Sequence, residues 1–76
     1  MNYEKIYNQI IERAKSRNLD GYSEKHHIIP KCMGGGNNKG NLVNLTAKEH
    51  FICHLLLTKM LTGKDKNKMV YELLPQ

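Results

Sequence analysis

The sequence predicts a small α+β domain in which a helix, two short strands and two further helices follow one another along the chain. Three observations support this prediction. Residues 3–17 and 47–61 carry apolar side chains at helical spacing, residues 22–30 and 41–45 favour extended structure, and a glycine- and asparagine-rich stretch lies between the two extended segments. With 76 residues, the chain is expected to form a single domain, 1–76, with a small core.

The net charge and the cysteine content indicate which partner and which cellular compartment to expect. The formal net charge of +5 and the isoelectric point near 9.4 suit a polyanionic partner, of which nucleic acid is the default. The chain opens without a secretory pattern and has no apolar stretch long enough to span a membrane. We therefore expect an intracellular protein that is not secreted and does not have a membrane as a partner. Disulfides are rare in that setting. Cys32 and Cys53 are therefore expected to be ordinary buried or loop cysteines, and a metal ion is expected to stabilise the small core.

The first helix is predicted over residues 3–17. Glu4 lies near its start and Lys15 and Arg17 lie near its end, as the helix dipole favours, and residues 18–21 supply a stop. The apolar face consists of Tyr3, Ile6, Tyr7, Ile10, Ile11 and Ala14.

Two short strands flank a loop. The first is predicted over residues 22–30, because two isoleucines favour extended structure and Pro30 suits a strand end. The loop, residues 31–40, holds four glycines and two asparagines but lacks the Gly-Lys-Ser/Thr pattern of a nucleotide-binding loop. The second strand is predicted over residues 41–45.

The second helix is predicted over residues 47–61. Thr46 and Glu49 form a capping box at its start, and the helix is apolar on most sides, which is typical of a buried helix. A third helix, with one apolar face, is predicted over residues 66–74.

All four histidines lie in two places, on the first strand and on the second helix. His50 and His54 are four residues apart, so both imidazoles project from one helix face and can hold one metal ion. His26 and His27 are adjacent in a strand, where neighbouring side chains point to opposite faces. One of this pair can therefore turn toward a metal while the other stays free as a candidate general base.

This arrangement resembles the HNH endonuclease family, whose fold is the ββα-metal fold, or His-Me finger. The blocks that match the family motifs are Lys25-His26-His27-Ile28-Ile29-Pro30, Asn41 followed by Leu42, and His50 with His54. The resemblance covers about residues 23–57. Within the family, the sequence looks most like phage and intron-encoded homing endonucleases, in which a His-His-Ile-Ile-Pro block and a Glu-His-Phe block occur together.

Two features depart from the family pattern. Many members carry Asp at the position of His26, and homing members usually carry a C-terminal DNA-recognition part. The resemblance therefore implies either the catalytic part of a longer enzyme or a minimal nuclease.

The resemblance also implies roles for the histidines. His27 would be the general base that takes a proton from the attacking water, and its ordinary pKa near 6.5 suits that task. His26 and His50 would be metal ligands. His54 would complete a three-histidine site, with contact to a phosphate as the alternative in Asp-type members.

An asparagine is implied to support this site. Asn41 would tie the loop together and hold a backbone carbonyl against the ring of His27, with Asn44 as the rival for that role.

The implied function is hydrolysis of DNA phosphodiester bonds with one divalent ion (Zn²⁺, Ni²⁺, Mn²⁺ or Mg²⁺) and without a small-molecule substrate. We expect zinc to bind most tightly, because imidazole suits Zn²⁺ whereas Mg²⁺ prefers oxygen ligands. The alternative is a non-catalytic, zinc-stabilised nucleic-acid-binding module, in which His26, His50 and His54 would hold a structural zinc. A fourth ligand from His27 or Cys53 would favour this alternative, because structural zinc sites normally have four protein ligands. The lysines that flank the motif are candidates either for phosphate contacts or for an ordinary solvated surface: Lys25, Lys31, Lys39 and Lys48.

Overall fold

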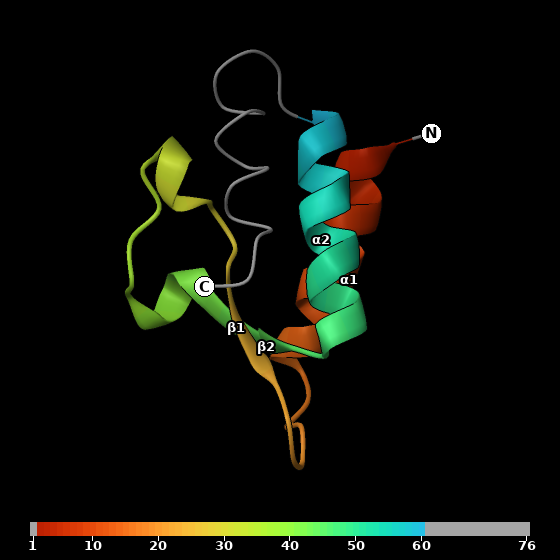
Figure 1. Ribbon diagram of the computed structural model, residues 1–76, viewed down its shortest axis with the longest axis vertical. Helices are drawn as coiled ribbons and strands as arrows, with labels where there is room; N and C mark the ends of the chain where they lie inside the picture. Colours follow the sequence, from red (N-terminus) through yellow and green to blue (C-terminus); the bar gives the residue numbers. More distant parts are fainter. Residues whose placement is uncertain (1, 61–76) are drawn as a thin grey trace.

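The computed structural model describes residues 2–60 (Figure 1). Its elements are α1 (Tyr3–Lys15), β1 (Glu24–His27), the short 3₁₀ helices η1 (Lys31–Met33) and η2 (Lys39–Asn41), β2 (Leu42–Leu45) and α2 (Ala47–Met60). The predicted α+β class is confirmed, and so is the predicted order of helix, strand, strand and helix. The helix predicted over residues 66–74 lies outside the described residues.

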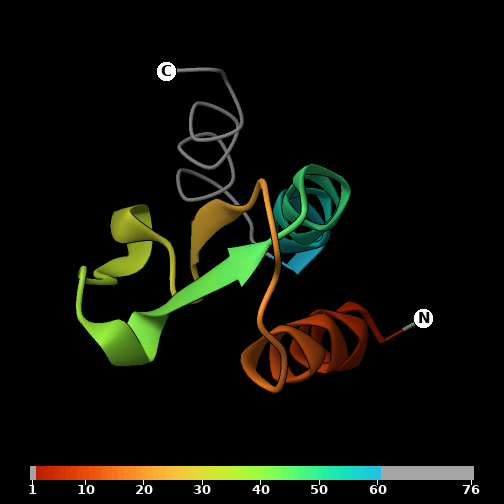
Figure 2. The ribbon, with the colours of Figure 1, turned by 90° about the horizontal axis from the view of Figure 1, so that it is seen from below.

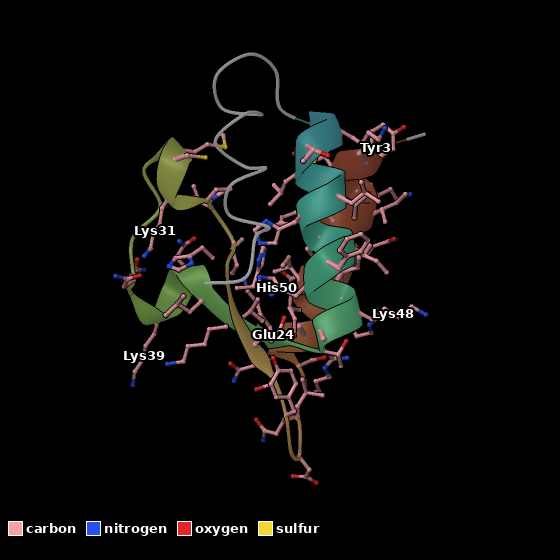
Figure 3. All side chains as sticks on the ribbon, viewed as in Figure 1. Tyr3, Glu24, Lys31, Lys39, Lys48 and His50 are labelled. Atoms are coloured by element: carbon pink, nitrogen blue, oxygen red, sulfur yellow. The ribbon has the colours of Figure 1, made fainter. Side chains whose placement is uncertain are left out.

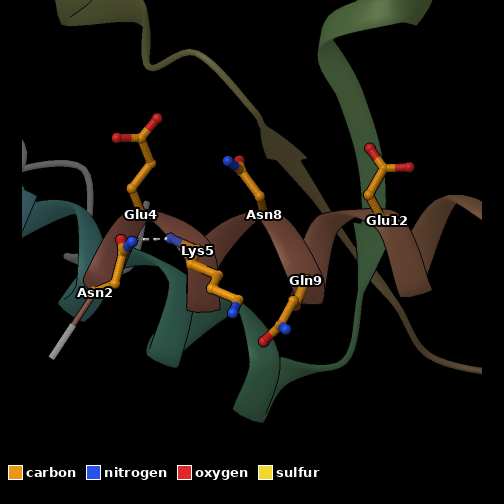
Figure 4. Close-up of a pocket in the computed structure, with 6 residues that line it drawn as sticks. All are labelled: Asn2, Glu4, Lys5, Asn8, Gln9 and Glu12. Atoms are coloured by element: carbon orange, nitrogen blue, oxygen red, sulfur yellow. Dashed lines mark hydrogen bonds between the residues drawn. The ribbon is translucent and has the colours of Figure 1, made fainter.

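Helix α1 is capped by Asn2, whose side-chain oxygen accepts a hydrogen bond from the backbone N–H of Lys5 at 3.0 Å (Figure 4). The helix ends at Lys15, two residues earlier than expected, because the N–H and hydroxyl of Ser16 both turn back to the carbonyl of Arg13. One face is buried and carries Tyr7, Ile11 and Ala14. The opposite face is polar, and its side chains line the shallow pocket of Figure 4: Asn2, Glu4, Lys5, Asn8, Gln9 and Glu12.

Strands β1 and β2 pair antiparallel, with His26 opposite Val43 and Lys25 opposite Asn44. His26 and Val43 are buried whereas Lys25 and Asn44 are exposed, as the alternation of a strand requires. Strand β1 is shorter than the expected residues 22–30. It ends at His27 because the side chain of Asn41 takes both backbone groups of Ile29, which are therefore not available to a partner strand.

The two helices lie side by side on one side of the hairpin, and the loop of residues 31–41 projects on the other side (Figures 1 and 2). The predicted capping box is present: the N–H of Thr46 donates to Glu49 Oε1 at 3.0 Å, and the N–H of Glu49 donates to Thr46 Oγ1 at 3.1 Å. The same carboxylate accepts hydrogen bonds from Arg13 and Arg17. Glu49 therefore starts α2 and also fastens it to the end of α1.

Consecutive glycines let the loop fold back on the end of β1. Gly34 has φ of 90°, a conformation that favours glycine. At Gly35, a Cβ atom would lie 1.7 Å from the carbonyl oxygen of Ile29, so only glycine fits there. The loop is consequently held against the chain that follows the histidine pair.

Among the helices of residues 2–60, none has the length and apolar character needed to cross a membrane.

Candidate metal centre

Strand β1 and helix α2 bring three of the four histidines together. One ligand nitrogen from each of His26, His50 and His54 lies within 4.8 Å of the others. The ring centroids of His50 and His54 are 4.7 Å apart, and His26 lies 5.3 and 5.2 Å from them. The helical spacing of His50 and His54 and the inward direction of His26 on the strand are what produce this cluster. Figure 3 shows His50 in the space between the hairpin and α2.

The orientation of His50 is fixed by a carboxylate on β1. His50 Nδ1 lies 2.7 Å from Glu24 Oε1, so that nitrogen donates its proton to the carboxylate. The other ring nitrogen, Nε2, faces His54 Nε2 at 3.0 Å. Glu24 also accepts the hydroxyl proton of Tyr22, and the bonds from Tyr22 and His50 hold the pKa of Glu24 below its usual range.

Burial keeps two members of the cluster, His26 and His54, neutral. His26 is 1% exposed, and burial together with the charges of His54, His50 and His27 lowers its pKa to about 3. Burial, with the charges of His50 and His27, lowers the pKa of His54 to about 4. Neutral imidazole is the form that binds a metal ion.

The donor set fits a divalent metal ion. His26 Nδ1 is buried and has no hydrogen-bond partner, which is a costly state for a polar atom and one that a metal ion would relieve. In the described part of the chain, the cluster comprises three histidines and includes neither His27 nor Cys53. Three imidazoles leave an open coordination position, which is typical of a catalytic rather than a structural site.

His27 lies beside the cluster without joining it. It follows His26 directly in strand β1, where neighbouring side chains point to opposite faces. Its Nε2 lies 2.8 Å from Asn37 Oδ1. Since an amide oxygen can only accept, Nε2 carries the proton and Nδ1 keeps the lone pair. Asn37 was not among the predicted site residues, and the available signal was a polar amide in a glycine-rich loop.

Asn41 is buried and bonds to the loop. Its Oδ1 accepts from the N–H of Ile29 at 2.8 Å, and its Nδ2 donates to the carbonyls of Ile29 at 3.0 Å and Gly36 at 2.9 Å. Its own carbonyl accepts from the N–H of Ile28 at 2.9 Å. These bonds fix the chain just after the histidine pair, while the side-chain contact to the His27 ring comes from Asn37. The rival, Asn44, is exposed on β2.

The four flanking lysines are exposed but do not share one surface. Lys25 and Lys39 line a groove together with Lys15, at the end of α1, and Arg17, just after it, two cations that were not among the predicted phosphate contacts. Lys31 lies on the loop, and Lys48 lies on the far side of the molecule at the start of α2 (Figure 3).

The two cysteines lie away from the cluster's donor set. Cys53 is fully buried in the core, where burial raises the pKa of its thiol to about 11. Cys32 is half-buried and packs against the core.

The described residues thus form an α+β domain with the order helix, strand, strand, helix and with a three-imidazole cluster between hairpin and helix. The chain is similar to curated phage proteins over most of its length. It is 61% identical over 66 residues to probable mobile endonuclease E of Enterobacteria phage T4, which covers 86% of this chain and 47% of that protein. It is 55% identical over 65 residues to probable mobile endonuclease D of the same phage, with 79% of this chain and 25% of that protein covered.

A third relative comes from a different source. An uncharacterized 38.5 kDa protein in psbA intron 1 of Chlamydomonas moewusii is 40% identical over 68 residues, covering 86% of this chain and 19% of that protein. The chain spans less than half the length of these curated relatives. No protein-family model and no solved structure matches it. The chain is therefore related to the phage mobile endonucleases, which confirms the predicted relationship to phage homing endonucleases. The names of these relatives do not mention the HNH class.

Proposed function

We propose that this chain is a metal-dependent nuclease domain of the HNH type that hydrolyses DNA phosphodiester bonds inside the host cell, as the catalytic part of a homing-type endonuclease. The observation that carries the proposal is the cluster of three imidazoles whose ligand atoms lie within 4.8 Å of one another, with a fourth imidazole, His27, next to His26 in strand β1. The names of the relatives, which are probable endonucleases, support the same activity.

In this mechanism, His26, His50 and His54 would hold the divalent ion. A bound ion supplies positive charge that stabilises the negative charge developing on the phosphate and on the leaving 3′ oxygen. His27 takes a proton from the attacking water at Nδ1, while Asn37 holds the ring through Nε2. Because His27 activates the nucleophile, one ion suffices, and the products carry a 5′ phosphate and a 3′ hydroxyl.

The donor chemistry suggests which ion is preferred. Three imidazole nitrogens without a carboxylate favour Zn²⁺ for binding over Mg²⁺. Activity is a separate property, because a tightly held zinc ion can restrict the geometry needed for phosphoryl transfer. We therefore expect Mn²⁺, Ni²⁺ or Co²⁺ to support cleavage at least as well as Mg²⁺.

We assign the phosphate contacts chiefly to the groove of Lys15, Arg17, Lys25 and Lys39. Its cations come from α1, from the segment that follows α1, from β1 and from η2, so the groove joins parts of the chain that are distant in sequence. Such contacts position DNA without reading its sequence. Residues 1–76 alone are therefore expected to cut with little sequence preference, and Lys31 and Lys48 are expected to contribute less to binding.

A plasmid-nicking assay across several metal ions tests the proposal. His27→Ala is expected to keep the fold and zinc affinity but to lose roughly 10²–10⁴-fold in cleavage rate, the usual contribution of a general base. Asn37→Ala removes one supporting hydrogen bond, a loss of about 1 kcal/mol or about fivefold in rate. Asn38→Ala, the neighbouring loop amide, is the matched control and should cut normally.

Two results would contradict these assignments. Cleavage by His27→Ala at the wild-type rate would remove His27 from the mechanism. A wild-type protein that binds zinc and DNA but does not cut DNA with any of the metal ions tested would favour the non-catalytic nucleic-acid-binding module instead.

A further inference from the structure

The hydroxyl of Tyr7 contacts the candidate metal centre from the N-terminal helix. Tyr7 is buried on the inner face of α1, 19 residues before His26 in sequence. Its hydroxyl oxygen lies 2.7 Å from His26 Nε2 and 2.7 Å from the carbonyl oxygen of Ile28. The rings of Tyr7 and His26 meet edge to face, with centroids 5.9 Å apart.

Counting protons assigns the direction of both bonds. A phenol has one proton, and a carbonyl oxygen can only accept, so the Tyr7 proton is donated to Ile28. The Tyr7 oxygen must then accept from His26, which places a proton on His26 Nε2. A neutral imidazole has a single N–H, so His26 Nδ1 carries a lone pair. That nitrogen is the buried atom without a hydrogen-bond partner.

We propose that Tyr7 is a positioning residue of the metal centre: its hydroxyl holds His26 in the Nε2–H tautomer and thereby presents Nδ1 as the metal-binding atom. The inference rests on the proposed metal site of His26, His50 and His54. It extends that site beyond the motif region of about residues 23–57 to helix α1. The Ile28 carbonyl contributes to this arrangement, because it accepts the hydrogen bond from the Tyr7 hydroxyl and so prevents that hydroxyl from donating to the imidazole.

Two different partners thus select opposite nitrogens on two ligands. On His50, the carboxylate of Glu24 accepts a hydrogen bond from Nδ1–H and leaves Nε2 for the metal. On His26, the hydroxyl oxygen of Tyr7 accepts a hydrogen bond from Nε2–H and leaves Nδ1 for the metal. A hydrogen bond at one ring nitrogen commonly decides which nitrogen binds a metal ion.

Tautomers in the metal-free protein provide the first test. Long-range ¹H–¹⁵N correlation spectra identify which nitrogen of each neutral imidazole is protonated. Wild-type His26 is expected as the Nε2–H tautomer and His50 as the Nδ1–H tautomer. In Tyr7→Phe, which removes only the hydroxyl, the Nε2–H preference of His26 should be lost while His50 is unchanged. The matched control is Tyr3→Phe, one turn earlier on the same helix and also packed against the core.

Zinc affinity, measured by competition with a chelating indicator, provides the second test. Tyr7→Phe should bind zinc about 10–100-fold more weakly than wild type, the usual effect of losing a partner of a metal-binding histidine. Tyr3→Phe should bind as wild type does. Circular dichroism on each variant shows that the helices are retained.

The outcomes separate this inference from the metal site itself. A wild-type protein that binds no divalent ion would overturn the metal site and the role of Tyr7 with it. Wild-type binding that Tyr7→Phe matches would overturn the role of Tyr7 alone. A wild-type His26 protonated at Nδ1 would also overturn it, and that measurement needs no variant to fold.

Discussion

The Nδ1 atom of His50 lies 2.7 Å from Oε1 of Glu24, which links helix α2 to strand β1 at the edge of the histidine cluster. The two residues are 26 positions apart in sequence, so the contact exists only in the folded chain. The hydrogen bond fixes the orientation of the His50 ring, with Nε2 directed toward His54. Carboxylate partners of this kind orient metal-binding histidines and raise their basicity.

Removing this carboxylate should weaken metal binding. Glu24→Ala is expected to reduce zinc affinity about 10–100-fold. Glu24→Gln should lose less, because an amide oxygen still accepts from Nδ1 although the negative charge is gone. Isothermal titration with zinc measures both, with Glu12→Ala on the exposed face of α1 as the control. Equal affinities for Glu24→Ala and Glu12→Ala would show that the contact does not support the site.

Zinc should stabilise the fold, because binding to the folded state alone shifts the unfolding equilibrium. At a free zinc concentration of 100 times Kd, the gain in unfolding free energy is about 2.7 kcal/mol. Thermal melts with zinc and after addition of a chelator measure the difference. The replacement His54→Ala should remove most of this gain. A melting temperature that ignores the chelator, in protein shown to start metal-loaded, would refute the coupling.

Acid should destabilise the metal-free protein before its carboxylates titrate. In the unfolded chain, His26 and His54 take up protons near pH 6.5, whereas the folded protein holds their pKa values at about 3 and about 4. The unfolded state therefore binds more protons below pH 6.5, and stability falls as the pH drops from there toward 4. The hydrogen bond from Arg17 lowers the pKa of Glu49 from 4.5 to about 2. Glu49 therefore adds a loss of stability only below pH 4.5.

Urea unfolding at pH 8, 7, 6 and 5 isolates the histidine contribution. His54→Gln should show a shallower decline than wild type over this range. Glu49→Gln should keep the wild-type slope there and be less stable by about 1 kcal/mol throughout, as expected for a partly exposed ion pair at a helix cap. Stability that rises on acidification from pH 7 to pH 5 would contradict the neutral state of His26 and His54.

The cationic groove should govern nonspecific DNA binding. The double variant Lys25→Ala/Lys39→Ala is expected to bind duplex DNA more weakly and to make the log–log dependence of affinity on salt shallower by about 2, one unit per lost phosphate contact. Fluorescence anisotropy at several salt concentrations measures the slope. The charge-matched control is Lys5→Ala/Lys59→Ala, outside the groove residues. Equal slopes for the two double variants would remove the groove from the interface.

Local patterns predicted the parts of the site that depend on one element. The four-residue spacing of His50 and His54 on a helix and the alternation around His26 on a strand are properties of single segments, and the structure brings these three residues together. The capping box of Thr46 and Glu49 is equally local. These features follow from backbone geometry that a sequence shows directly.

Contacts between elements could not be predicted in this way, because no single segment of the sequence contains them. Tyr7 has the spacing of an ordinary core residue on α1, and nothing local to it indicates that its hydroxyl meets His26. Strand β1 ended early because the amide of Asn41 takes both backbone groups of Ile29, a competition that β propensity does not contain. The partnership of Asn37 with His27 likewise depends on how the loop returns.

The run Gly34-Gly35-Gly36 looks uniform in sequence, yet its three members face different constraints. Gly34 is held by its positive φ, and Gly35 by the backbone of Ile29, whereas a Cβ at Gly36 would meet only the Asn38 side chain, at 3.3 Å. A saturation library selected for function should therefore keep glycine at the first two positions and admit alanine or serine at the third. In evolutionary terms, a segment that resembles low-complexity linker would drift at one residue and stay fixed at the two beside it.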